Sequence, residues 1–184
     1  YNVTEDADLG FRLARHGYDM DLIHLPTFET PPDTLRSWLP QRCRWIKGYM
    51  QTLLVHSRTP RRLSPAITGA LLLSLGLGTL SAICYAPFMA LLLARSLLSL
   101  LQPGAVLMNW PDLLLLCLSL TAAQLSLAIG ARRANLPLSL NDRLMAPVYW
   151  ALQSLAAIFA CHQLLVKPFH WDKTDHSPMA TAPR

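Results

Sequence analysis

Charge is scarce in this chain. Asp, Glu, Lys and Arg make up 15% of its 184 residues, and 52% of the residues are hydrophobic. A soluble domain usually carries charge on roughly a quarter of its residues. Most of the charges lie within residues 1–62, and long uncharged runs follow. The composition excludes a soluble domain throughout and predicts a polar module joined to a membrane module.

Paired cysteines are also lacking. The four cysteines are far apart, which excludes the spacing of a zinc site, and three lie in apolar runs where small buried side chains are expected. They are Cys43, Cys84, Cys117 and Cys161. Neither a His-Glu-x-x-His motif nor a nucleophile elbow is present. His56 lies near a predicted helix end, where we expect it to be solvated.

The chain opens on Tyr1, with no initiator Met and no leader peptide, and we interpret it as the C-terminal part of something longer. Its formal net charge is +5, and the basic residues flank the apolar runs. That placement fits anionic lipid head groups and the positive-inside rule. The sequence shows no basic patch with interleaved aromatics of the kind that binds single-stranded nucleic acids, so no nucleic-acid partner is expected.

The first residues have the features of a short helix. Thr4 suits an N-cap, acidic side chains follow it, and Gly17 is a natural C-terminal stop. Asp8 and Arg12 are four residues apart and can pair on one face. We therefore expect a helix over residues 5–16.

A short strand and a second helix are expected next. Residues 20–25 alternate weakly between apolar and polar side chains, which is the spacing of a strand. Residues 40–55 form a broad apolar stripe bordered by polar and basic side chains, and Pro40 suits an early helical position. Such a helix either lies in a membrane interface or packs on a soluble core, and the sequence leaves both open.

Three apolar runs follow. Residues 66–94 and 113–131 hold no charge and are long enough for a membrane span, which needs about 20 residues. The run over residues 144–166 has a similar length but contains Pro147 and His162. The positive-inside rule favours two spans plus an interfacial or re-entrant helix, and three spans are the alternative.

Two short motifs have side chains suited to chemistry. Glu5 and Asp6 lie in the first turn of the first helix, and a carboxylate there that faces a cleft can act as a general base. Gln41, Arg44 and Trp45 share one face of the second helix. Arginine suits diphosphate oxygens, tryptophan offers a flat face to a sugar ring, and Gly48 leaves room beside them. Taken separately, the motifs are better explained by ordinary helix capping and by an amphipathic helix with an interfacial Trp.

Together the motifs resemble a known family. Thr4-Glu5-Asp6, then Gln41-x-x-Arg44-Trp45, then apolar runs are similar to the processive family 2 glycosyltransferases, such as cellulose and hyaluronan synthases. The resemblance continues over residues 8–13, and over residues 46–48 after the second motif. The tail, residues 167–176, resembles the Trp-x-Lys-Thr-x-His ending of one bacterial branch.

The resemblance implies an inverting sugar transfer. Asp6 would be the catalytic base, with Glu5 in support. Gln41 and Arg44 would hold the nucleotide diphosphate, and Trp45 would stack on the acceptor end of the growing glycan. A gating segment in the tail would include Trp171, Lys173, Thr174 and His176.

The resemblance also implies an architecture. Residues 1–57 would be the C-terminal remnant of an α/β nucleotide-sugar domain of the GT-A type, ending in an interfacial helix. Residues 58–166 would form a helical membrane module with spans at about 66–94 and 111–131. Residues 167–184 would be a cytoplasmic tail. The setting would be a bacterial inner membrane, with the catalytic part in the cytoplasm.

The expected partners are a nucleotide-sugar donor, a growing polysaccharide or lipid-linked acceptor, the bilayer, and other polysaccharide-synthesis subunits. A divalent cation, Mg²⁺ or Mn²⁺, would offset the diphosphate charge. The family's upstream Asp-x-Asp motif is absent here, so we assign no metal ligand within this sequence. The cation would be bound mainly by residues missing from it, and the fragment alone is expected to be inactive.

Two other interpretations stay open at this point. A non-enzymatic membrane component, such as a transporter subunit or an assembly scaffold, explains the composition but not the two motifs. A transferase that adds a single sugar to a lipid carrier explains both.

Overall fold

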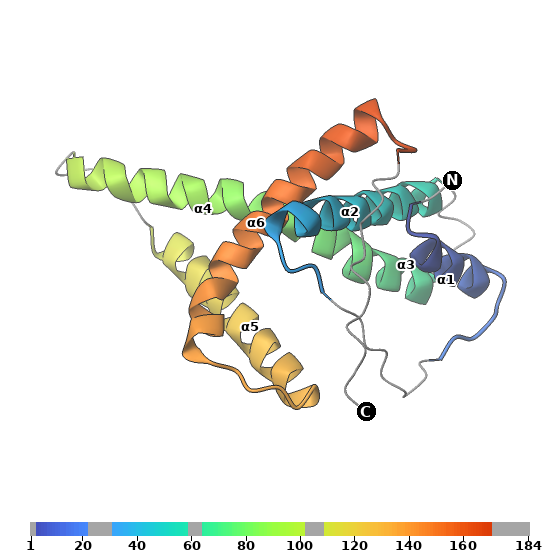
Figure 1. Cartoon of the computed structure of the whole chain (residues 1–184), viewed down its shortest axis with the longest axis horizontal. Coiled ribbons are helices and arrows are strands. Elements are labelled where there is room, and N and C mark those ends of the chain that lie inside the picture. Colours follow the sequence, from blue (N-terminus) through green and yellow to red (C-terminus); the bar gives the residue numbers. More distant parts are fainter. Residues whose placement is uncertain (1–2, 22–30, 59–63, 102–108, 171–184) are drawn as a thin grey trace. The chain divides into compact units, whose positions relative to one another are not determined.

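The computed structural model describes residues 3–21, 31–58, 64–101 and 109–170, and every regular element within these ranges is helical (Figure 1). The helices are α1 (Glu5–Arg15), α2 (Leu35–Ser57), α3 (Pro65–Leu71), η2 (Leu72–Gly76), α4 (Leu77–Leu101), α5 (Trp110–Arg133) and α6 (Leu140–Val166).

The expected α/β remnant is wrong, because no strand occurs in the ranges that the structure describes. Met20 and Asp21 have no regular structure, and the rest of the predicted strand, residues 22–25, lies outside those ranges. A strand needs a paired neighbour to satisfy its backbone groups, and one weakly alternating segment supplies none. The flanking residues have helical spacing instead, and they form α1 and α2.

Helix α1 closely follows its prediction. It ends at Arg15, and Gly17 follows with a φ of 79°, a left-handed conformation that glycine adopts without a Cβ clash. Asp8 Oδ2 lies 2.7 Å from Arg12 Nε, which confirms the expected pair. Thr4 occupies the N-cap position, but its side chain makes no capping hydrogen bond.

Helix α2 begins earlier than its prediction. Thr34 Oγ1 accepts a hydrogen bond of 3.2 Å from the backbone N–H of Ser37, and this cap starts the helix at Leu35. Pro40 therefore lies inside the helix rather than at its start. The cap decides the boundary, because it satisfies an amide that has no partner within the first turn.

The chain divides into two compact units. The first comprises Tyr1–Ile83 and Leu152–Arg184, and the second is Cys84–Ala151. The boundary falls within α4 and within α6, so each of these helices contributes residues to both units.

The core of the first unit lies between α2 and the second half of α6. The alanines of α6 in this core are completely buried, and such small side chains let two helices approach closely. The core residues are Cys43, Ile46, Met50, Ala156, Ala157 and Ala160. Their spacing of three and four residues is that of a single helix face. One face of α2 thus packs on α6, which is itself apolar enough to cross a membrane, so the choice between an interfacial helix and a soluble core stays open.

Three stretches of the described chain are long and apolar enough to cross a membrane: Pro65–Leu98, Trp110–Arg133 and Leu140–Val166. They contain the three predicted apolar runs. The first passes through α3, the π-helical turn η2 and most of α4. Large apolar side chains such as Leu73 and Leu93 are exposed, which suits contact with lipid. The number of spans stays a prediction, because length and composition alone underlie these assignments.

Two polar contacts join helices within the second unit. Arg95 Nη1 of α4 lies 3.1 Å from Asp112 Oδ2 in the first turn of α5. Gln124 Nε2 of α5 donates a 3.0 Å hydrogen bond to the carbonyl of Arg143 in α6. Polar pairs of this kind are favourable where the alternative is an unsatisfied group in an apolar setting.

Candidate functional site

The two sequence motifs meet where Thr4 packs on Gly48. A Cβ built on Gly48 would lie 2.3 Å from Thr4 Oγ1 and 2.4 Å from Thr4 Cγ2, and both residues are buried. A real Cβ cannot occupy that position unless Thr4 moves. Glycine therefore brings the start of α1 directly onto α2, one turn beyond Arg44 and Trp45. The space that the sequence predicted beside Gly48 is occupied by the side chain of Thr4, which belongs to the first motif.

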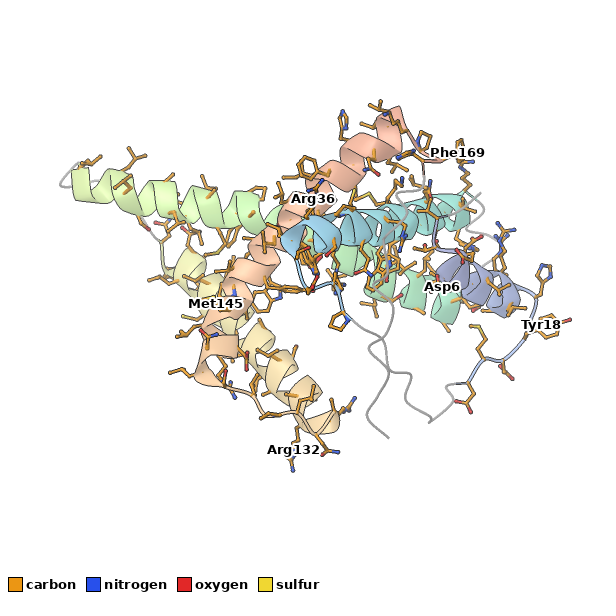
Figure 2. The ribbon with its side chains drawn as sticks, in the orientation of Figure 1. Asp6, Tyr18, Arg36, Arg132, Met145 and Phe169 are labelled. Atoms are coloured by element: carbon orange, nitrogen blue, oxygen red, sulfur yellow. The ribbon has the colours of Figure 1, made fainter. Side chains whose placement is uncertain are left out.

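The predicted base lies in the first turn of α1, where it is exposed (Figure 2). Asp6 Oδ1 accepts a 2.8 Å hydrogen bond from the backbone N–H of Ala7, which orients the carboxyl group. Glu5 is exposed on the same turn. Exposure leaves Asp6 accessible to a hydroxyl group of a substrate, as a general base requires.

The predicted diphosphate and acceptor residues lie together on α2. Gln41, Arg44 and Trp45 are half-buried, so each side chain retains accessible surface. Because α2 is continuous through them, the helical spacing predicted from the sequence places them on one face. Gly48 continues that face to Thr4 and so connects it with Asp6.

Arg42 contacts two tryptophans of α2. Its guanidinium carbon lies 4.6 Å from the ring centroid of Trp45 and 5.8 Å from that of Trp38. Both distances suit a cation–π interaction. Its buried Nε has no hydrogen-bond partner among the described residues. Sequence reasoning missed this role, although Arg42 stands four residues after Trp38 and three before Trp45, which is the spacing of neighbours on a helix.

A buried polar cluster docks α1 on α2. His56 Nε2 lies 3.0 Å from Asp8 Oδ1, and Arg15 Nη1 lies 3.4 Å from His56 Nδ1. A guanidinium group only donates, so Nδ1 accepts, and Nε2 carries the proton that it donates to Asp8. The ring of Phe11 covers the imidazole at a centroid distance of 5.7 Å. The contacts fix α1, and with it Asp6, against the second motif helix.

The expectation that His56 is solvated is wrong, since its side chain is completely buried. Its position near the end of α2 suggested exposure, but α1 covers that end of the helix. No local pattern in the sequence signals this contact, because Asp8 and His56 are 48 positions apart.

The predicted gating residues Trp171, Lys173, Thr174 and His176 lie outside the residues that the structure describes. Their role stays a prediction.

The described residues contain no cluster of side chains that would hold a divalent cation by itself. Across the ranges 3–21, 31–58, 64–101 and 109–170, no three His, Cys, Asp or Glu side chains gather into a group that could hold a metal ion. We therefore derive no step through a cation. The expectation that residues outside this sequence bind it stays a prediction.

A family model matches most of the chain. The family model described as "Glycosyl transferase family group 2" matches residues 1–167. No curated protein and no solved structure matches the chain.

Proposed function

The chain belongs to the glycosyl transferase family group 2, and from this premise we propose that it carries the base and the leaving-group helix of an inverting, membrane-integrated sugar transferase. Asp6 on α1 is the base in this proposal, and Gln41, Arg44 and Trp45 on α2 bind the reacting molecules. The donor is a nucleotide sugar.

The proposed step exchanges one bond for another. Asp6 takes the proton of an acceptor hydroxyl, and that oxygen forms a bond to the anomeric carbon of the donor. The bond from that carbon to the diphosphate oxygen breaks, and the configuration inverts. Arg44 and Gln41 hold the departing nucleoside diphosphate, because a guanidinium fork and an amide N–H suit phosphate oxygens. Trp45 stacks on the acceptor sugar through the apolar face of its ring.

The observation that carries the proposal is the packing of Thr4 on Gly48. It joins a segment with an exposed carboxylate to a helix whose accessible side chains suit a diphosphate and a sugar. Neither helix by itself requires the close approach of Thr4 to Gly48, since each motif has an ordinary explanation when it is taken alone. The family match covers both motifs and favours an enzyme over a transporter subunit or scaffold.

The proposed setting is the bacterial inner membrane, with α1 and α2 on the cytoplasmic side. The apolar helices support a location in a bilayer. The acceptor in this proposal is a growing polysaccharide or a lipid-linked glycan. Product length distinguishes these two acceptors. Membranes containing the full-length protein and a labelled donor should yield a ladder of long products for a polymerase, and one added sugar for a single-addition enzyme.

Substitution of the base tests the proposal. In the full-length protein, Asp6→Asn removes the proton acceptor while keeping the size of the side chain and its acceptor for Ala7 N–H. We expect transfer of labelled sugar to fall by about a hundredfold or more, with unchanged accumulation in membranes. Asp19→Asn, an exposed carboxylate outside both motifs, is the matched control. Equal transfer by the Asp6→Asn and Asp19→Asn variants would show that Asp6 is not the base.

A further inference from the structure

Two polar side chains of α2 are buried one turn apart, just beyond Trp45. Lys47 is 1% exposed and Gln51 is 8% exposed. Residues four apart share a helix face, so the two side chains point to the same side of α2. Burial of an ammonium group is unfavourable unless hydrogen bonds compensate it. The partners of Lys47 therefore indicate what this face of the helix binds.

Both side chains bind the end of α6 and the turn after it. Lys47 Nζ donates to Gln163 Oε1 at 3.1 Å and to the carbonyl of His170 at 2.6 Å. Gln51 Nε2 donates to the carbonyl of Pro168 at 2.8 Å. Gln163 lies in the last turn of α6, where the negative end of the helix dipole favours a cation. Lys47 is thus placed where its charge has a favourable partner.

Gln51 also binds the segment that leads to the base. Its Oε1 accepts a 3.2 Å hydrogen bond from the backbone N–H of Val3. The two ends of one amide group therefore join Val3, three residues before Asp6, to Pro168. Thr4 packs on Gly48, which lies between Lys47 and Gln51 in the sequence.

Packing alone does not fix the turn over residues 167–170. Phe169 is 71% exposed. Beside it lies a hollow of about 310 Å³, whose lining includes Arg12, Leu164 and Pro168. Space next to the turn leaves it free to shift once its hydrogen bonds are lost, because few atoms oppose the movement. The turn has backbone hydrogen bonds of its own, from Lys167 N–H to the carbonyl of Gln163 and from His170 N–H to the carbonyl of Lys167. The contacts of Lys47 and Gln51 tie this turn to α2.

We propose that Lys47 and Gln51 are positioning residues. They hold the end of α6 and the turn over residues 167–170 in a fixed position relative to Asp6. This inference rests on the proposed transfer. Loss of either contact releases the turn and, through Gln51 and Val3, lets the base-bearing segment shift.

Kinetics of the full-length protein in membranes test the proposal. Lys47→Met keeps the length of the side chain and removes the ammonium group. We expect kcat to fall between about tenfold and a hundredfold, as for other small misplacements of catalytic groups. The donor KM should change by less than about threefold, because Gln41 and Arg44 remain. Lys47→Arg, which keeps the charge and the donors, should recover part of the lost kcat. Lys167→Met is the matched control, because it removes an exposed ammonium from the same turn.

Hydrogen exchange gives a readout that loss of general stability does not reproduce. In Lys47→Met, amide exchange should rise in peptides covering residues 3–8 and 163–170, and stay unchanged in α5. Unchanged exchange in residues 3–8, or a kcat equal to that of Lys167→Met, overturns the positioning role.

A second variant decides the question if Lys47→Met does not accumulate. Gln51→Glu keeps an acceptor for Val3 N–H and loses the donor to Pro168. A tenfold fall in kcat supports the proposal, and wild-type kcat rejects it. A wild-type protein that transfers no sugar counts against the proposed function instead, and the exchange measurements still test the positioning.

Discussion

Asp8 of α1 and His56 of α2 form a buried hydrogen bond, with 3.0 Å between Oδ1 and Nε2. The residues are 48 positions apart in the sequence, and the imidazole has no exposed surface. Asp8 stands two residues after the proposed base. The pair therefore fixes the helix that carries Asp6.

Loss of His56 should destabilise the protein. His56→Leu keeps an apolar side chain beside Phe11 but leaves the Asp8 carboxylate paired with Arg12 alone among the described side chains. A buried acceptor that loses a donor costs about 1–3 kcal/mol. We expect a lower thermal unfolding midpoint for the purified full-length protein in detergent. His16→Leu, at an exposed histidine just after α1, is the control, and equal midpoints for the two variants contradict the docking role.

Substitution of Gly48 should separate the two motifs. In Gly48→Ala the new methyl group meets Thr4 Oγ1, Cγ2 and Cβ, all within 2.7 Å, so α1 must move away from α2. We expect sugar transfer to fall by at least about tenfold. The double variant Gly48→Ala with Thr4→Gly removes the clash and should recover part of the loss.

Gly69→Ala is the control for the alanine itself, because a Cβ there meets nothing within 4 Å. Alanine in that helix should be neutral or slightly stabilising, by about 0.5–1 kcal/mol. Wild-type transfer by Gly48→Ala contradicts the close approach of Thr4.

Local patterns in the sequence predicted the helices well. The acids after Thr4 and the stop at Gly17 gave the limits of α1 to within one residue. The uncharged runs predicted the three apolar stretches, since length and composition are enough to recognise a helix of this kind. Asp8 and Arg12 were paired correctly, because a spacing of four residues brings side chains together on any helix.

Contacts between distant segments could not be predicted. Three such contacts join residues too far apart in the sequence for helical spacing to relate them: Thr4 with Gly48, His56 with Asp8, and Lys47 with Gln163. The expected sheet failed for a related reason. A strand depends on pairing with another segment, and one alternating stretch of residues contains no information about its neighbour.

Arg42 and Arg44 should respond differently to substitution. Arg42 stacks on Trp38 and Trp45, so Arg42→Ala should lower stability by about 1 kcal/mol with little effect on the donor KM. Arg44 is proposed to hold the diphosphate, and Arg44→Ala should lower kcat/KM for the donor by about a hundredfold. Thermal unfolding and donor kinetics on both variants check this. A reversed result, with Arg42 controlling donor kinetics, means that the roles of the two arginines must be exchanged.

Reversing both charges of the ion pair between α4 and α5 should restore the accumulation in membranes that each single charge reversal lowers. Arg95 Nη1 lies 3.1 Å from Asp112 Oδ2, and both residues lie in helices that are apolar enough to cross a membrane. A charge without its partner is unfavourable there, so Arg95→Asp and Asp112→Arg should each reduce accumulation of the full-length protein in membranes. The double variant re-forms the pair with opposite signs and should accumulate more than either single one. Arg132→Asp, at an exposed arginine near the end of α5, is the control for charge reversal alone. If the double variant accumulates no better than the worse single variant, the pair does not hold the two helices together.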